Sequence, residues 1–121
     1  MKNKPFEMCM LFDFYGDILT DKQRQLFDLY YNDDLYLAEI SEHVGITRQG
    51  VRDGILRAEH TLRETEEKLG LVARYGRNQA ALEELSDLAK EIRSINKIRH
   101  HDPAIAELCE KALAITERLT E

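Results

Sequence analysis

The sequence predicts an all-α protein, and three observations lead to this fold class. Apolar residues recur at intervals of three and four along most of the chain, which places them on one face of a helix. Six glycines, two prolines and few valine-rich runs give little support for strands. The 121 residues, of which 43% are hydrophobic and 33% charged, suit one modest core beneath a charged helical surface.

The first 35 residues show the patterns of two amphipathic helices. The first pattern runs from Pro5, a residue suited to a first helical turn, to Leu19, and we expect the helix to end near Gly16. The second follows residues 20–23, TDKQ, which have the form of a capping box, and the turn residues 32–34, NDD, end it. We interpret the aromatic residues of this region as core, with a ligand pocket as the alternative: Phe12, Phe14, Tyr15, Phe27, Tyr30, Tyr31 and Tyr36.

Residues 36–58 have the pattern of two helices joined by a tight bend. Gly45 separates the helices, and glycine tolerates a left-handed backbone at a helix C-terminus. Thr47 offers a hydroxyl group to cap the second helix, which we expect to extend to Gly70. This order is typical of a helix-turn-helix motif. The two apolar stripes consist of Leu37, Ile40 and Val44, and of Ile46, Val51, Ile55 and Ala58.

The candidate binding residues lie on the face of the second helix opposite its apolar stripe. This face carries Arg48, Gln49, Arg52 and Asp53, directly after the cap Thr47. Arg48 and Arg52 are four residues apart and therefore share one face. Guanidinium and amide groups can match guanine and adenine edges in a major groove. DNA contact is one interpretation, and solvated polar side chains on a three-helix core are the other.

Two glycines lie near the start of this long helix. Gly50 and Gly54 each cost roughly 1 kcal/mol of helix stability relative to alanine. One interpretation is that the missing side chains let DNA or another protein approach closely. The other is that the glycines are tolerated without a role.

The C-terminal part of the chain predicts a helical hairpin. We expect residues 71–78, LVARYGRN, to form a linker with Gly76 as the helix breaker, and residues 79–121 to form the hairpin. Asp102 followed by Pro103 is an N-cap with proline at the first helical position. Each helix carries apolar residues that we expect to form one seam, which in the first helix is close to a heptad repeat: Leu82, Leu85, Leu88, Ala89, Ile92 and Ile95, and then Ile105, Leu108, Cys109, Ala112, Leu113, Thr116 and Leu119.

Two helices of this size cannot fully bury such a seam by themselves. We therefore expect the hairpin to form a homodimer, and the alternative is that it folds back onto the first domain. The predicted organisation is a helix-turn-helix domain with its long recognition helix in residues 1–70, the linker in 71–78 and the hairpin in 79–121.

The sequence shows no pattern for catalysis, for a cofactor or for a metal. It contains no Gly-rich phosphate loop, nucleophile elbow or Cys-His-Asn set, so we expect no enzyme activity and no cofactor. Cys9 and Cys109 lie far apart and form no metal signature with the four histidines, so we expect reduced thiols. The absence of a secretion signal and of an apolar run near the roughly 18 residues of a membrane span predicts a cytoplasmic protein without membrane contact.

The charge of the chain is unusual for a protein that binds duplex DNA. The net charge of −6 divides into −3 in residues 1–35, −1 in residues 36–76 and −2 in residues 77–121. Proteins of this class gain much of their affinity by neutralising phosphates. We therefore expect any DNA binding to be weak, salt-sensitive or dependent on dimerisation.

Three groups of segments between about residues 6 and 75 are distinctive: FDFYG with LT and KQR, LYYNDDL, and AEIS followed by TRQGVRD. Together they resemble the YlxM-type helix-turn-helix proteins of Gram-positive bacteria. In this family, a module like region 4 of RNA polymerase sigma factors precedes a helical tail. The resemblance implies a DNA-binding regulatory protein associated with the signal recognition particle pathway. It places base contacts at Arg48, Gln49 and Asp53, and Arg52 near phosphate.

Three positions depart from the sigma-type pattern. Tyr36 replaces the usual N-cap Ser, Gly50 replaces a larger residue, and Asp53 brings a negative charge close to DNA. Two hypotheses follow. The first is a dimeric DNA-binding regulator. The second is a protein or ribonucleoprotein adaptor that has kept the scaffold without duplex affinity and acts on the signal recognition particle.

Overall fold

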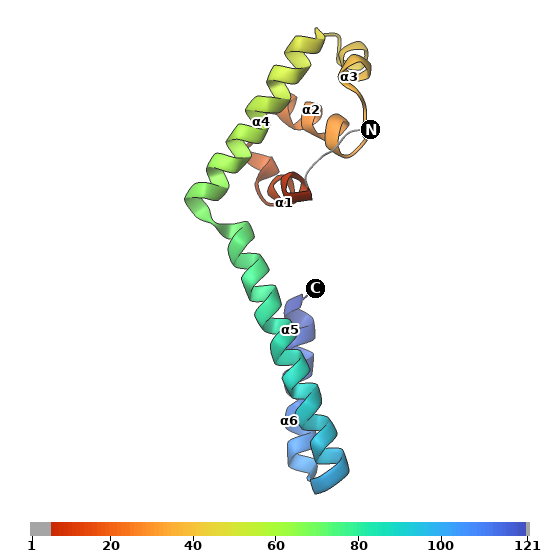
Figure 1. Ribbon diagram of the computed structural model, residues 1–121, viewed down its shortest axis with the longest axis vertical. Helices are drawn as coiled ribbons and strands as arrows, with labels where there is room; N and C mark the ends of the chain where they lie inside the picture. The colour runs from red at the N-terminus through yellow and green to blue at the C-terminus, as the bar shows by residue number, and fades with distance from the viewer. Residues whose placement is uncertain (1–5, 121) are drawn as a thin grey trace. The chain divides into compact units, whose positions relative to one another are not determined.

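The computed structural model describes residues 6–120, and every regular element in that range is a helix (Figure 1). The predicted all-α fold is therefore confirmed. The chain divides into two compact units, residues 1–72 and 73–121. The predicted helix start at Pro5 lies outside the described residues. The helices are α1 (Phe6–Tyr15), α2 (Asp21–Tyr31), α3 (Leu37–Val44), α4 (Arg48–Leu69), α5 (Leu71–Ile95) and α6 (Pro103–Thr120), with a 3₁₀ turn at Gly16–Ile18 and a π-helical turn at Asn96–His100.

The core of the first unit forms around α4. One cluster joins α1 and α2 to the second half of α4, and a smaller cluster joins α2 and α3 to its first half. The rings of Phe12, Phe27 and Tyr31 stack in series at centroid distances of 4.6 and 4.2 Å. The buried members are Met8, Leu11, Tyr15, Leu19, Phe27, Ala58 and Leu62 in the first cluster, and Leu26, Ile40, Val51 and Ile55 in the second.

Two aromatic residues do not belong to this core. Phe14 is 38% exposed and Tyr36 is 57% exposed, so the prediction that they are core residues is wrong. Phe14 lies one residue before the buried Tyr15 and therefore points to another side of α1. Tyr36 is the residue before α3, where its backbone N–H donates to Glu39 Oε1 at 2.9 Å.

Local capping fixes the ends of the motif helices, as the sequence predicts. Gly45 has a φ of +76° after α3, and Gly70 has a φ of +64° after α4. The Thr47 hydroxyl accepts a hydrogen bond from the Gly50 N–H at 3.0 Å at the start of α4. Before α2, Thr20 and Gln23 form the reciprocal capping box, with both bonds at 3.1 Å. These caps satisfy backbone groups that the helix ends would otherwise leave without partners.

Gly54 allows α2 and α4 to approach closely. A Cβ atom at this position would lie 2.5 Å from Cδ1 of the buried Leu26. At Gly50, an added Cβ would lie 3.2 Å from the Thr47 hydroxyl oxygen. The surface that lies close to Gly54 therefore belongs to this chain itself. This explanation differs from both sequence interpretations, which were the approach of DNA or another protein and a glycine without a role.

The segment predicted as a linker is helical. Residues 71–78 form the first two turns of α5, and Gly76 does not interrupt the helix. A single interior glycine costs about 1 kcal/mol, which a helix of 25 residues rich in Leu, Ala and Arg tolerates. The chain instead breaks between α4 and α5 at Gly70, where the backbone is left-handed.

The hairpin unit buries small side chains and leaves large ones exposed. Its buried residues are Ala89, Asn96, Cys109 and Thr116. The prediction of one apolar seam for each helix is therefore wrong. Each hairpin helix carries two neighbouring apolar stripes, of which only one faces the other helix. The spacing of the apolar residues alone did not distinguish the two stripes. The exposed large residues include Leu85, Leu88, Ile92, Ile95, Leu108, Ile115 and Leu119, each between 43% and 64% exposed.

The turn of the hairpin is held by a buried asparagine. Asn96 Nδ2 donates to the Asp102 carbonyl oxygen at 2.9 Å, and the Asp102 N–H donates to Asn96 Oδ1 at 2.9 Å. The Asp102 carboxylate accepts a hydrogen bond from the Ala104 N–H at 2.9 Å, which confirms the predicted N-cap of α6. The side-chain amide of Asn96 and the carboxylate of Asp102 thus both have hydrogen-bond partners at the turn itself.

Two tyrosines connect α4 to the other helices through carboxylates. The Tyr15 hydroxyl donates to Glu66 Oε1 at 2.6 Å and accepts a hydrogen bond from the Leu71 N–H at 3.1 Å. The Val72 N–H donates to the same Glu66 oxygen at 3.0 Å. The Tyr31 hydroxyl donates to Glu59. In both tyrosines, burial and then the neighbouring carboxylate raise the pKa above the ordinary value near 10.

The close approach of Leu26 to Gly54 predicts that the effect of alanine at position 54 on stability depends on the residue at position 26. We expect Gly54→Ala to lower the free energy of unfolding by about 1 kcal/mol, because overpacking against Leu26 outweighs the gain in helix propensity. In a Leu26→Val background, which lacks the Cδ1 atom, the same substitution should raise that free energy. Urea unfolding of the four proteins, followed by circular dichroism, measures both effects. A stabilising Gly54→Ala in the wild-type background would contradict the packing explanation.

The raised pKa values of Tyr15 and Tyr31 predict a loss of stability at alkaline pH. Because both groups have a higher pKa in the folded than in the unfolded state, their contribution is complete below about pH 10 and is lost as pH rises above it. Absorbance titration near 295 nm should show both hydroxyls ionising later in the folded chain than in urea. Tyr15→Phe and Tyr31→Phe should each remove part of this late absorbance change. An unchanged titration curve in both variants would contradict the assignment.

Candidate nucleic-acid interface

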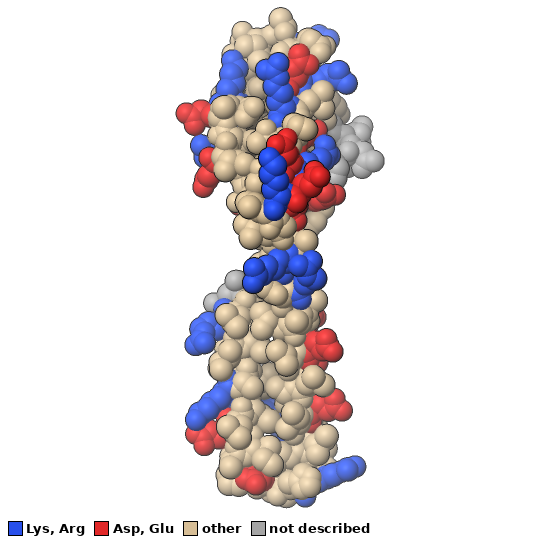
Figure 2. Space-filling view, turned by 90° about the vertical axis from the view of Figure 1, so that its left-hand side faces the viewer, with Lys and Arg blue, Asp and Glu red and all other residues tan. Residues whose placement is uncertain are grey.

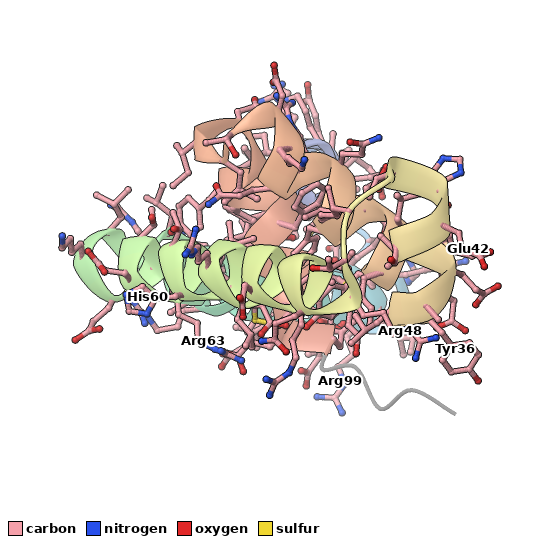
Figure 3. All side chains as sticks on the ribbon, turned by 90° about the horizontal axis from the view of Figure 1, so that it is seen from above. Tyr36, Glu42, Arg48, His60, Arg63 and Arg99 are labelled. Carbon is pink, nitrogen blue, oxygen red and sulfur yellow. The ribbon has the colours of Figure 1, made fainter. Side chains whose placement is uncertain are left out.

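The apolar stripe of α4 determines which of its residues reach the surface. Val51 and Ala58 are fully buried and Ile55 is 4% exposed, so the predicted inward stripe is confirmed. Residues on the opposite side of a helix with this stripe must point away from the core. Figure 3 shows Arg48 and Arg63 projecting on the same side of α4.

All five residues singled out from the sequence lie together on the surface. Thr47, Arg48, Gln49, Arg52 and Asp53 are exposed, and they occupy the cap and the first two turns of α4. No ion pair joins Arg48 or Arg52 to another residue within the described range 6–120. Both guanidinium groups therefore keep their donors available for a ligand.

Gln49 and Asp53 are paired with each other. Gln49 Nε2 donates to Asp53 Oδ1 at 3.0 Å, across one turn of the helix. The Asp53 carboxylate is thus partly satisfied by a neighbouring amide, and the amide oxygen of Gln49 remains available as an acceptor. The sequence placed both residues on this face but did not predict that they bind one another.

In the second half of α4, two basic side chains lie beside the carboxylate of Glu64. His60 Nε2 and Lys68 Nζ each lie 3.1 Å from a carboxylate oxygen of Glu64. The hydrogen bond from Lys68 is the main cause that lowers the pKa of the Glu64 carboxyl. On the face drawn in Figure 2, basic and acidic side chains are interspersed over the first unit. Within α4, the arginines that form no ion pair in the described range are Arg48, Arg52 and Arg57 in the first half and Arg63 in the second.

A groove lies between the start of α2 and the first half of α4. It is lined by Gly50 and Gly54 and by three charged residues, Lys22, Asp53 and Arg57. Sequence reasoning missed Lys22 and Arg57, because only tertiary packing brings the start of α2 beside α4. One signal was available for Arg57, which lies four residues after Asp53. The lining residues are Thr20, Lys22, Gln23, Leu26, Ile46, Gly50, Asp53, Gly54 and Arg57.

The described part of the chain holds neither a cluster of metal ligands nor a membrane-spanning helix. Within it, no group of three or more His, Cys, Asp or Glu side chains could hold a metal ion. Among the same residues, no helix has the length and apolar character needed to cross a membrane. Cys9 and Cys109 are both free thiols.

Comparisons with known proteins identify close relatives over most of the chain. The sequence model of the UPF0122 family, described as "Putative helix-turn-helix protein, YlxM / p13 like", matches residues 2–101. The UPF0122 protein of Thermoanaerobacter sp. (strain X514) is 46% identical over 112 residues, 93% of this chain and 92% of the relative. The UPF0122 protein of Acetivibrio thermocellus is 47% identical over 87 residues, 71% and 74% of the two chains. That of Bacillus cereus (strain AH187) is 43% identical over 97 residues, 80% and 88%.

Proposed function

Because this chain belongs to the UPF0122 family of YlxM/p13-like helix-turn-helix proteins, we propose that it is a regulatory protein that binds duplex DNA through the first turns of α4. The observation that carries this proposal is the pair Arg48 and Arg52. Both are exposed, share one face and make no ion pair within the described range. Their helix is fixed from behind by the buried stripe of Val51 and Ile55.

Each exposed residue has a role in this proposal. Arg48 and Gln49 read base edges in the major groove, and Arg52 binds a phosphate. Thr47 caps the helix, so the first turn keeps its geometry. Asp53 holds the Gln49 amide, and its carboxylate can accept a hydrogen bond from a cytosine amino group.

A single helix-turn-helix unit with two such arginines binds DNA weakly, so the proposal includes a homodimer formed by the hairpin. Large exposed residues follow heptad spacing on both hairpin helices, and the middle of this unit in Figure 2 carries few charged side chains. A second copy would cover this stripe and complete a four-helix bundle. The stripe comprises Leu85, Leu88, Ile92 and Ile95 on α5, and Leu108, Ala112, Ile115 and Leu119 on α6.

The area of this stripe is suitable for a dimer. At about half exposure, these side chains present roughly 700 Å² of apolar surface, close to the contribution of each partner in a standard protein interface. A monomer seldom exposes an apolar patch of this size without a partner. In this proposal, residues 1–70 are the DNA-binding domain and residues 79–121 provide the dimer contact.

Charges placed in the apolar stripe should separate the copies. We expect the wild-type chain to have about twice the 14.1 kDa mass of one chain, and Leu88→Glu combined with Ile92→Glu to be monomeric. Lys90→Glu, which adds negative charge on the polar side of α5, is the matched control and should remain dimeric. Sedimentation velocity measures the mass. A monomeric wild-type chain at about 100 μM would contradict the dimer.

The central test of DNA binding is the double variant Arg48→Ala with Arg52→Ala. We expect it to lose about tenfold or more in affinity for a duplex from upstream of its own gene, because one base contact and one phosphate contact are removed. The slope of log affinity against log salt should fall by about one unit. Fluorescence anisotropy at several salt concentrations measures both quantities.

The matched control removes two cations that are already ion-paired. Arg24→Ala with Lys68→Ala changes the net charge by the same amount, but the side chains involved are bound to carboxylates away from the first turns of α4. Its salt slope should equal that of the wild type. If wild-type protein at micromolar concentration shows no salt-dependent binding, duplex recognition is refuted.

The interspersed acidic side chains and Asp53 favour a second candidate function. In this alternative, the chain is a protein or ribonucleoprotein adaptor that acts on the signal recognition particle without binding duplex DNA. Co-purification of signal recognition particle components that is unaffected by Arg48→Ala with Arg52→Ala would support the adaptor over the DNA regulator. A pull-down without such components would count against it.

A further inference from the structure

We propose that the first turns of α5 form a second contact to the phosphate backbone of duplex DNA, made by Arg74 and Arg77. This inference rests on the proposed DNA-binding function and adds a site in the second unit. None of the candidate residues selected from the sequence lies in this segment.

The segment is the longest part of the chain without acidic residues. Residues 70–82 contain Arg74 and Arg77 and neither Asp nor Glu, although the whole chain has a net charge of −6. On the face drawn in Figure 2, the blue side chains at the N-terminal end of the hairpin unit have no red side chain beside them. The first two turns of α5 therefore carry no acidic side chain of their own.

The two arginines are arranged to act on one ligand. They are three residues apart on a continuous helix, so their Cβ atoms lie about 5–6 Å apart. Both are exposed, and neither forms an ion pair with any residue from 6 to 120. Asn78, four residues after Arg74, is exposed on the same face and offers a further amide donor.

The side chains favour a phosphate backbone over an acidic protein surface. Both cations are arginines, whose planar fork binds phosphate oxygens through two parallel hydrogen bonds. The neighbouring polar groups, Asn78 and the 40% exposed Tyr75, are of the types that position proteins on duplex phosphates. Most of the exposed large apolar side chains of this unit lie on the stripe assigned to the dimer.

The test uses the full chain and a mixed-sequence duplex of about 30 base pairs, roughly three helical turns. We expect Arg74→Gln with Arg77→Gln to lower the salt slope of binding by about 1.8, or 0.9 for each lost phosphate contact. The matched control, Lys90→Gln with Lys97→Gln, removes from the same unit two exposed cations that form no ion pair within residues 6–120, and it should keep the wild-type slope. Fluorescence anisotropy measures the slopes.

The remaining outcomes separate this inference from the proposed function. If Arg48→Ala with Arg52→Ala lowers the slope and the α5 double variant does not, only the α5 contact is overturned. If the wild-type chain does not bind the duplex at all, both are overturned. If the α5 variant loses binding to a single-stranded RNA or to an acidic polypeptide and keeps duplex binding, the assignment to duplex DNA is overturned.

Discussion

The burial of one apolar stripe on α4 is the constraint on which the rest of the first unit depends. Val51, Ile55, Ala58 and Leu62 are all nearly or fully buried, and they contact both clusters of the core. Burial of each aliphatic side chain contributes about 1.5–3 kcal/mol, far more than any single surface charge. The rotation of α4 about its axis is therefore fixed by apolar packing, and the position of its arginines follows from that rotation.

The positive charge of the candidate site comes from a few side chains and not from the net charge of the chain. A net negative chain cannot attract DNA over long distances, but Arg48 and Arg52 have no carboxylate bound to them in the described range. The nearest acidic side chain on this face, Asp53, is engaged by Gln49. The chain thus keeps a small set of available donors on a largely neutralised surface, which fits modest affinity and dependence on a second copy.

The sequence predicted those features that depend on neighbours in the chain. The turn at Gly45, the caps Thr20 and Thr47, the end of α4 at Gly70 and the inward stripe of α4 all follow from spacing and local backbone chemistry. Features that depend on distant residues were missed. Tyr15 meets Glu66, 51 residues later, and Gly54 meets Leu26, and no periodic pattern encodes either pair.

Two errors in the second half of the chain have a common physical origin. A glycine was treated as a break, yet the 25-residue helix α5 absorbs Gly76 because helix formation is cooperative. One apolar seam was expected on each hairpin helix, yet two adjacent stripes exist, and periodicity does not tell which one faces the other helix. The buried positions that face the other helix are occupied by the small residues Ala89 and Cys109.

The hydrogen bonds around Tyr15 also help to keep α4 and α5 two separate helices at Gly70. A single uninterrupted rod from α4 into α5 would require the N–H groups of Leu71 and Val72 to turn back to carbonyls of α4. Those two groups are already engaged by the Tyr15 hydroxyl and by Glu66. Merging the helices would break these two hydrogen bonds, each worth about 1 kcal/mol. Side chains of α1 and α4 therefore stabilise the helix break at Gly70, which does not depend on glycine flexibility alone.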